Sequence, residues 1–351
     1  MELYVRNKQK QVIGIIDAYN SVIWSKRYNS VGDFEIYTLV TPEIMELLKY
    51  DYYITRLDDD MVGIIEHIII SSDEEEGAYI TISGRSAESI LSRRIVWNQT
   101  NLNESVESGI RRLIDENVIN PTIPERKIPD FILGNIQGFT DKIEKQITGD
   151  NLLDAISKIC NTYELGFRVT LDNIGQFKFS LYRGEDRSYG QQINPYVVFS
   201  PTFDNLLNSE YESDLTNYKN VALVAGEGEG AERKTKSVGT SEGMDRRELF
   251  VDARDLSSSI DGNTQLSDEE YNAVLKDRGS ESLSETNSTE AFSGETEPKT
   301  TYTYKADYFI GDIVQIENEY GITAAPRIVE IMESDDDTGY RIVPGFTTME
   351  V

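Results

Sequence analysis

Three short clusters of acidic residues are the first candidates for chemistry in this sequence. They lie at Asp58–Asp60, Asp73–Glu76 and Asp335–Asp337. Carboxylates at such spacing could bind calcium, which prefers oxygen ligands. The first cluster breaks the EF-hand pattern, because Ile69 stands where the bidentate glutamate of the loop should be. We therefore interpret all three clusters as solvated turns between strands, and we predict no metal site.

A glycine-rich segment could in principle cradle a phosphate. It runs from Gly226 to Arg233 and reads Gly-Glu-Gly-Glu-Gly-Ala-Glu-Arg. It lacks the Gly-Lys-Ser/Thr ending of a P-loop and the spacing of a dinucleotide fingerprint, and its three glutamates would repel a phosphate. We therefore predict no cofactor site and interpret the segment as an assembly loop. The candidate contact residues are Gly226, Glu227, Gly228, Glu229, Gly230 and Arg233.

The chain has one histidine, His67, and one cysteine, Cys160. Catalysis by histidine needs a partner nucleophile or a metal, and a lone histidine cannot form a multi-histidine metal site. Cys160 falls on an apolar stripe at helical spacing, which predicts a buried thiol. The sequence contains neither a Gly-x-Ser-x-Gly elbow nor a His-Glu-x-x-His helix. We therefore predict no catalytic residue and no enzymatic activity.

The composition excludes further classes of function. The chain of 351 residues carries 62 acids and 34 bases, a net charge of −28 at pH 7. Such a charge repels polyanions, so sequence-specific nucleic-acid binding is not expected. No stretch approaches the roughly 20 apolar residues of a membrane span, so no membrane anchor is expected. The 38% of hydrophobic residues is enough to build cores for two or three domains.

The first 84 residues are organised as short strands separated by polar turns. Alternating apolar residues with tight turns are typical of barrels and sandwiches. One short helix interrupts the strands, because Thr41 can cap it and Pro42 suits its first position. We therefore predict a β-barrel-like domain over residues 1–84. Its expected strands are Leu3–Val5, Val12–Ile16, Ser21–Tyr28, Asp33–Val40, Tyr52–Leu57, Met61–Ser71 and Ala78–Ser83.

Residues 85–195 have a different pattern and are predicted to form an α+β domain. The segment Asn151–Glu164 places its apolar residues on one stripe at helical spacing. Asp150 is positioned to cap this helix, and Gly166 to end it. Apolar residues at helical spacing predict two more helices earlier in the domain. A hairpin follows, with strands Phe167–Leu171 and Gln176–Tyr182 around a polar turn.

Residues 196–351 return to a strand pattern and are predicted to form a second β-barrel-like domain. Residues 226–243 are rich in glycine, glutamate and serine, which indicates a long loop. Residues 261–300 are strongly acidic and predict a solvated helical insert, with a helix at Asp268–Lys276 opened by Ser267. The expected fold is thus mainly β, with two β-barrel-like domains around an α+β domain. The strands expected here are Tyr218–Ala225, Arg247–Val251, Thr301–Tyr304, Ile313–Glu317, Arg327–Met332 and Gly339–Val343.

Several stretches together resemble one family of phage proteins. These are the hub or tail-tip proteins of long-tailed phages of Gram-positive hosts and of related prophage-derived particles. Each stretch is short, but their order and spacing extend over nearly the whole chain. The stretches are Trp24–Tyr28, Val31–Ile36, Gly63–Glu66, Ile82–Ser86, Ile90–Val96, Asn220–Arg233, Leu249–Asp255, Asp307–Asp312 and Gly345–Phe346.

The resemblance implies a baseplate-hub-like structural protein. Its relatives form rings, usually of three copies, that continue the tail tube. It implies as partners further copies of the chain, a distal tail or tail tube protein, a tape measure protein, and receptor-binding or tip proteins. The implied location is the tail tip of a virion or phage-like particle assembled in the bacterial host cytoplasm. The tail could be contractile or non-contractile, and the particle an infective phage or a bacteriocin.

Two other functions stay open at this point. The first is a receptor- or carbohydrate-binding tip protein, for which exposed aromatic residues would be the signature. Tyr189, Tyr196, Tyr302 and Tyr304 are the candidates. The second is a tail-associated cell-wall hydrolase. With 62 acids in the chain, paired carboxylates are unavoidable, so their presence does not by itself indicate a glycosidase site.

Overall fold

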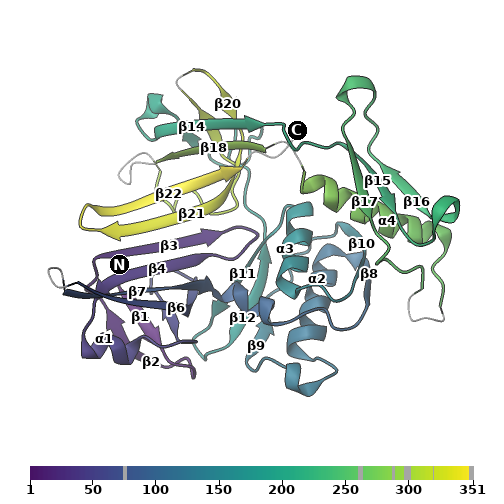
Figure 1. The fold of residues 1–351 in the computed structure, drawn as a ribbon. Coiled ribbons are helices and arrows are strands. Elements are labelled where there is room, and N and C mark those ends of the chain that lie inside the picture. Colours follow the sequence, from purple (N-terminus) through teal and green to yellow (C-terminus); the bar gives the residue numbers. More distant parts are fainter. Residues whose placement is uncertain (74–76, 260–263, 287–288, 296–301, 319, 348–351) are drawn as a thin grey trace.

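The computed structural model describes the whole chain except residues 74–76, 260–263, 287–288, 296–301, 319 and 348–351. The fold is mainly β with short helices, as predicted. Its largest unit is an eleven-stranded sheet with the order β14-β18-β22-β21-β3-β4-β7-β6-β5-β1-β2. Figure 1 shows this sheet on the left, a helical region at the lower centre, and a smaller α/β unit on the right. No helix among the described residues is both long and apolar enough to cross a membrane.

The N-terminal strands form where alternation and turn residues predict them. Thr41 accepts a hydrogen bond from the backbone N–H of Ile44 and so caps helix α1 (Pro42–Leu47), which confirms the predicted start of this helix. One face of the strands buries an apolar core around Trp24, Phe34 and Ile36. The strands are β1 (Leu3–Arg6), β2 (Val12–Ile16), β3 (Ser21–Arg27), β4 (Asp33–Leu39), β5 (Tyr53–Thr55), β6 (Val62–Asp73) and β7 (Gly77–Ser86).

Strands from the two ends of the chain share the large sheet. Strand β3 pairs antiparallel with β21 (Arg327–Asp336), from Ser21 opposite Asp336 to Arg27 opposite Glu330. Beyond β21 the sheet continues through β22 (Gly339–Thr347) and β18 (Thr289–Glu295) to β14 (Leu207–Asp214). Among the described residues its order ends at β14 and β2. The closure of strands into two barrels therefore stays a prediction.

The middle region packs its helices and small sheets around the largest apolar core. Cys160 is fully buried in this core, as its place on the apolar stripe predicted. The predicted hairpin is present as β11 (Gly166–Leu171) and β12 (Phe177–Tyr182). The other elements are η1 (Ala87–Arg93), β8 (Thr100–Ser105), α2 (Val106–Ile114), η2 (Asp115–Ile119), η3 (Pro124–Arg126), β9 (Phe131–Leu133), β10 (Lys142–Ile147) and α3 (Leu152–Thr162).

Both predicted ends of α3 are wrong by one or two residues. The cap is Asn151 and not Asp150, because the Asn151 side chain accepts a hydrogen bond from the N–H of Leu153 at 3.0 Å and donates one to Ser92 O. After the helix, Glu164 takes the left-handed conformation with φ 56°. Gly166 instead begins β11, where a Cβ atom would lie 2.4 Å from the Tyr28 ring.

A small unit is inserted between β14 and β18, and we call residues 215–286 the α4 module. A three-stranded sheet of β15 (Val221–Ala225), β16 (Thr235–Val238) and β17 (Glu248–Asp252) packs on helix α4 (Asp268–Ser284). The capping box of Ser267 and Glu270 is present as predicted. Figure 1 shows the module projecting from the rest of the molecule. It also contains the short turns η5 (Gly230–Glu232) and η6 (Gly243–Asp245).

Several predictions for the C-terminal region need correction. The expected loop 226–243 contains strand β16, because Val238 packs into the module core. The expected solvated insert 261–300 includes β18, and its helix α4 runs on to Ser284 and buries Tyr271, Val274 and Leu275. Of that insert, residues 261–263, 287–288 and 296–300 lie outside the described part.

The strand expected at 301–304 is also wrong. Residue 301 lies outside the described part, and the next three residues form only an isolated bridge from Tyr304 to Tyr308. The remaining elements of the region are β13 (Val198–Phe199), η4 (Pro201–Phe203), β19 (Gln315–Glu317) and β20 (Thr323–Ala324).

The corrected cap of α3 can be tested by substitution. Asn151→Ala removes the acceptor for the Leu153 N–H, and we expect it to lower the free energy of unfolding by about 1 kcal/mol. Asp150→Ala is the matched control and should change that free energy by less than about 0.5 kcal/mol. Urea denaturation of both variants measures the difference. A larger loss for Asp150→Ala would restore the original assignment.

Candidate functional site

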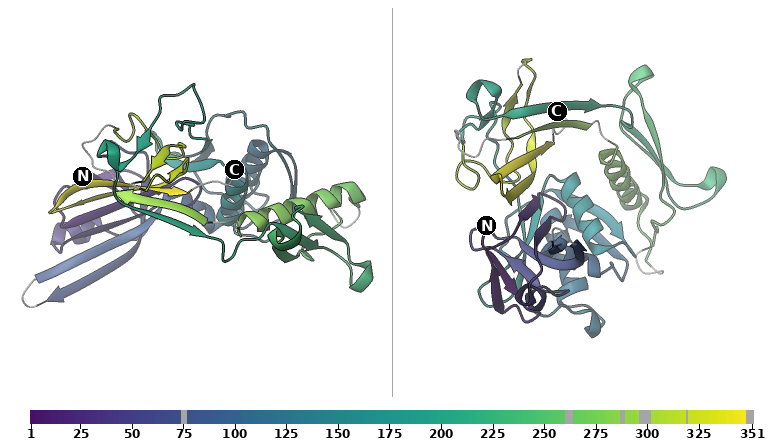
Figure 2. Two further views of the ribbon diagram at one scale, coloured as in Figure 1. Left: turned by 90° about the horizontal axis from the view of Figure 1, so that it is seen from above. Right: turned by 60° about the vertical axis from the view of Figure 1, so that its left-hand side comes forward.

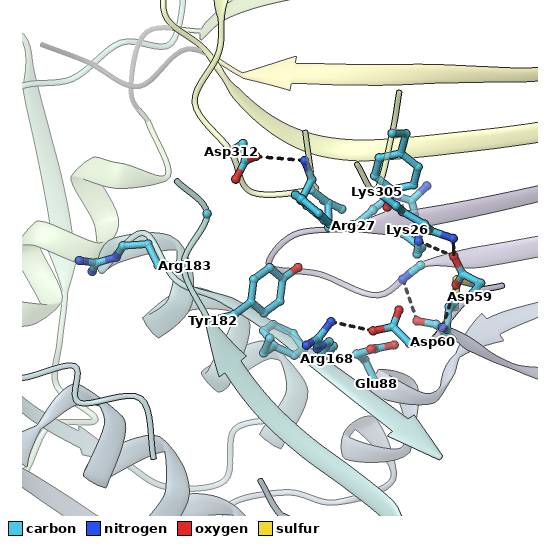
Figure 3. Close-up of a pocket in the computed structure, with 18 of the residues that line it drawn as sticks. Lys26, Arg27, Asp59, Asp60, Glu88, Arg168, Tyr182, Arg183, Lys305 and Asp312 are labelled. Atoms are coloured by element: carbon cyan, nitrogen blue, oxygen red, sulfur yellow. Dashed lines mark hydrogen bonds and ion pairs between the residues drawn. The ribbon is translucent and has the colours of Figure 1, made fainter. Parts of the chain in front are cut away.

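A cleft of about 670 Å³ lies where three parts of the chain meet. Its walls come from the N-terminal strands with the β5–β6 turn, from the β11–β12 hairpin, and from the C-terminal segment 304–312. Figure 3 shows charged side chains from all three parts pointing toward one another across the cleft. The acidic cluster Asp58–Asp60 lines the cleft from the turn between β5 and β6. All three carboxylates form ion pairs there, which a solvated turn would not do.

Asp59 is the buried centre of an ion cluster. Its carboxylate lies 2.5 Å from Lys26 Nζ and 2.6 Å from Lys305 Nζ, and its side chain is 0% exposed. Burial alone would raise the pKa of this carboxyl, but the two lysine charges hold the pKa well below its usual range. The interpretation of this position as a solvated acid is therefore wrong. Asp59 fastens a strand near one end of the chain to a loop near the other.

A second buried ion pair adjoins the first. Arg56 donates to Glu333 at 2.9 Å, and both side chains are at most 2% exposed. Arg56 also forms an ion pair with Asp58 at 2.6 Å, while the Tyr340 hydroxyl donates to Glu333 at 2.6 Å. Arg56 directly follows β5 near the N-terminus, and both Glu333 and Tyr340 come from the C-terminal strands β21 and β22. The two pairs together form a charged latch across the β3–β21 junction.

The opposite wall of the cleft is built by the β11–β12 hairpin. Arg168 forms an ion pair with Asp60 at 2.6 Å, and its guanidinium lies 5.4 Å from the centre of the Tyr182 ring. Glu88 accepts a hydrogen bond from the Val169 N–H at 2.7 Å, and burial raises the pKa of its carboxyl. These contacts join the middle region to the turn that carries Asp59. They position the walls of the cleft, and no side chain in them is paired as a nucleophile with a base.

The other sequence candidates lie elsewhere. His67 is exposed on β6 and does not line the cleft. Asp335 pairs with the N-terminal amine of Met1, and Asp336 caps the turn before β22. Within the described part of the chain, no group of three or more His, Cys, Asp or Glu side chains could hold a metal ion. Residues 74–76 of the second acidic cluster lie outside that part.

The predicted assembly loop forms the turn between β15 and β16. Arg233 donates to Gly226 O at 2.9 Å and forms an ion pair with Asp252. The Glu227 N–H donates to the Tyr271 hydroxyl at 2.9 Å. Gly226 is required here, because a Cβ atom would lie 2.3 Å from that hydroxyl oxygen. The structure thus brings the six residues together as an anchored turn in which Gly228, Glu229 and Gly230 are exposed. Their role in assembly stays a prediction.

The module that carries this turn contacts the middle region through polar groups. Lys145 on β10 contacts Glu281 and lies 3.7 Å from Asp277, both on α4. Burial raises the pKa of Asp277 to about 6. Lys158 on α3 adds an ion pair with Glu285 at 2.9 Å. The module therefore has its own apolar core and is held to its neighbour by charge.

The sequence reasoning missed the residues of the latch. Lys26 and Glu333 are charges within strands and Arg56 directly follows one, and solvent exposure is the default assumption for charged residues. A signal was available for Lys26, which shares the inward face of its strand with Val22 and Trp24 at a spacing of two residues. A charge on an inward position needs a buried partner of opposite sign. Nothing in the sequence indicates which distant residue provides it.

Comparison with known proteins points to one class. A family model described as Siphovirus ReqiPepy6 Gp37-like protein matches residues 2–346. No curated protein matches the sequence. The folds of three solved tail proteins are similar to this one, at identities that show shared fold alone.

The first is the 43 kDa tail protein of prophage MuSo2 from Shewanella oneidensis, with a TM-score of 0.59 and 15% identity over 99% of this chain and 98% of that one. The tail protein from Neisseria meningitidis MC58 has a TM-score of 0.60 and 15% identity, over 98% of this chain and 95% of that one. The prophage tail protein gp18 from Listeria monocytogenes EGD-e has a TM-score of 0.57 and 13% identity, over 99% of this chain and 94% of that one.

The buried charges of the latch predict a large loss of stability when the charge of Asp59 is removed. Asp59→Asn removes the charge between Lys26 and Lys305 and should lower the free energy of unfolding by about 3 kcal/mol at pH 7. The half-exposed Asp60→Asn is the control and should cost less than about 1 kcal/mol. Guanidinium denaturation measures both.

The same variant has a pH signature. Because the folded-state pKa of Asp59 is lowered, its stabilisation is present above the unfolded-state value of about 3.9. That stabilisation is lost as the pH falls through the folded-state value. The wild type should therefore lose more stability than Asp59→Asn between about pH 5 and pH 2. Parallel pH profiles of the two proteins would show that Asp59 has no such role.

Proposed function

The chain belongs to the Siphovirus ReqiPepy6 Gp37-like protein family, and on this premise we propose that it is a structural subunit of a phage tail tip. In this role, three copies form a hub ring that continues the tail tube and connects it to tip or receptor-binding components. The observation that supports this most is the extent of the similarity. The chain matches solved tail proteins along 94–98% of their own length, so the likeness is not confined to one small domain.

The net charge and the site suit this role. The cleft holds ion pairs that fasten remote parts of one chain, which serves rigidity. A net charge of −28 would keep DNA from adhering to a channel as it passes during ejection. The proposed partners are a distal tail or tail tube protein and a tape measure protein on one side, and receptor-binding or tip proteins on the other. The proposed location is the tail tip of the virion or phage-like particle, with assembly in the host cytoplasm.

A second candidate function rests on one exposed aromatic pair. Tyr189 and Tyr196 are 55% and 43% exposed, and their rings meet edge to face at 5.4 Å. Sugars stack on aromatic faces of this kind, so the pair supports the receptor- or carbohydrate-binding alternative. The other two candidates do not support a sugar site. Tyr304 is only 9% exposed and belongs to an apolar core with Phe199 and Phe346, and Tyr302 packs against that core.

The hub ring predicts a defined mass in solution. Light scattering across a hundredfold range of protein concentration should show a species near three times the chain mass of 39.8 kDa. Negative-stain images of that species should show a central channel. A protein that stays monomeric both alone and with the neighbouring tail tube protein would contradict the ring.

The carbohydrate-binding alternative makes a separate prediction. On arrays of host cell-wall glycans the protein should bind specific sugars, and the double variant Tyr189→Ala/Tyr196→Ala should lose at least about tenfold in affinity, as expected from loss of stacking contacts. Phe203→Ala, at an aromatic residue of similar exposure on another segment, is the matched control. Equal signals from the wild type and the double variant would exclude this pair as a sugar site.

A further inference from the structure

The long strand β6 has a backbone edge that no strand covers over most of its length. Its first four residues, 62–65, bond to β5 and to Tyr52 on one side, while β7 pairs along the other side. For the eight residues 66–73, no strand in the described part of the chain pairs with the outer edge. We call this segment the β6 arm. In the left view of Figure 2 the β6–β7 hairpin extends away from the body.

The side chains of the β6 arm are unusual for a free edge. Ile69 and Ile70 are 48% and 51% exposed, and His67, Ser71 and Ser72 are exposed beside them. Between Glu66 and Asp73 no residue carries a formal charge when the histidine is neutral. Soluble proteins protect free edges with charged residues, prolines, bulges or short strands, because a long apolar edge invites pairing with another chain. In the arm, the register irregularity between Ile65 and His67 and the charges of Glu66 and Asp73 lie at its two ends. The six residues between them, 67–72, have none of these protective features, which favours a strand that covers them in the assembled protein.

The same sheet offers a second free edge at its other end. Strand β14 pairs with β18 only, and it is the last strand of the order among the described residues. It has eight residues, the same length as the β6 arm. Its exposed Glu212 would face an uncharged stretch of the arm and not a second acidic strand. The two edges are therefore compatible in length, and they are compatible in charge in any register that keeps Asp214 away from Glu66, the first residue of the arm.

The strand directions also fit. From β14 to β6 the sheet takes seven steps, through β18, β22, β21, β3, β4 and β7, and every step is antiparallel. Because the number of steps is odd, β14 and β6 run in opposite directions. A neighbouring copy that continues the sheet in the same sense would thus place its β14 antiparallel to the β6 arm, which keeps the alternation of the sheet.

We propose that the β6 arm pairs with strand β14 of a second copy of this chain, so that the sheets of neighbouring copies join head to tail. The proposal rests on the hub ring proposed above and names the surface that builds it. A head-to-tail contact uses two different surfaces of each copy and closes into a ring when the rotation allows it. Main-chain hydrogen bonds would supply affinity, and cover of Ile69 and Ile70 would add apolar burial.

Disulfide trapping tests the pairing directly. With full overlap of the two eight-residue segments, His67 lies opposite Ser213 of the neighbour, but Glu66 then lies opposite Asp214. A shift of four residues places Ser71 opposite Ser213 and Ile70 opposite Asp214, so this register avoids the pair of acids. We would combine Ser213→Cys with His67→Cys or with Ser71→Cys, all at exposed positions. The native Cys160 is buried and does not interfere. Within one chain the two sites are seven strand steps of about 4.8 Å apart, too far for a bond.

One of these double variants should form covalent dimers and trimers on mild oxidation, about tenfold more than the control Ser71→Cys/Ser237→Cys, because docking raises the effective concentration of the thiols. Ser237 is an exposed serine on β16. A wild type that forms trimers while neither pair cross-links above the control would overturn the arm–β14 contact and leave the hub ring standing. A wild type that never associates would contradict the ring itself.

A second variant tests the contact between the β6 arm and β14 in a way that does not depend on the register of the two strands. Ile69→Lys/Ile70→Lys places charges on the arm without altering a buried side chain, so the monomer should unfold at the same temperature as the wild type. We expect the trimer fraction in light scattering to fall at least about tenfold, as for loss of an apolar contact at an interface. The control is Ile193→Lys, at a residue 92% exposed on another surface. An unchanged trimer fraction in the arm variant would refute the proposal.

Discussion

The pairing of β3 with β21 is the constraint on which the rest of the structure depends. It joins strands that are some 300 residues apart in the chain into one ladder, from Ser21 opposite Asp336 to Arg27 opposite Glu330. Without it, the N-terminal and C-terminal strands would be separate sheets, and the segment that carries Lys305 would not reach Asp59. The contact of the Met1 amine with Asp335 extends the same junction to the first residue.

Buried charge fixes the register of this junction. Glu333 on β21 meets Arg56 beside β5, and a slip of one residue would turn Glu333 to the opposite face of the sheet. A buried ion pair adds little net stability compared with apolar packing, but leaving one of its charges unpaired is costly. The latch therefore disfavours alternative pairings more than it stabilises the observed one. The proposed contact between copies needs two sheet edges at a set distance, and a single register provides that distance.

The α4 module follows a different physical rule. Its apolar core is its own, and its contacts with β10 and α3 are ion pairs and hydrogen bonds. Interfaces of this kind resemble those between separate proteins more than those within a core. The module is thus an insertion that the large sheet carries between β14 and β18, and no strand in the described part of the chain pairs with the outer edge of β14.

Much of this fold could be predicted from local features of the sequence. Alternation predicted the N-terminal strands, the Thr41-Pro42 pair predicted the start of α1, and the apolar stripe predicted α3 and the burial of Cys160. The order of short stretches along the chain predicted the tail protein family, which the family model confirms. Each of these signals lies within about fifteen residues or in linear order, so no folded structure is needed to see it.

The remaining features depend on contacts between distant segments. The sequence around Asp59 predicts a surface acid, and only the contacts with Lys26 on β3 and with Lys305 bury it. The sequence of β16 predicts a loop, and only the packing of Val238 into the core of the α4 module makes it a strand. The partner of β3 could not be identified either, because many strands of similar pattern could have occupied that edge. Sequence alone determined most of the N-terminal strands and the helices α1 and α3, since backbone preference and periodicity are local. Tertiary structure alone decided which strands pair and which charges are buried, since these depend on residues that meet only after folding.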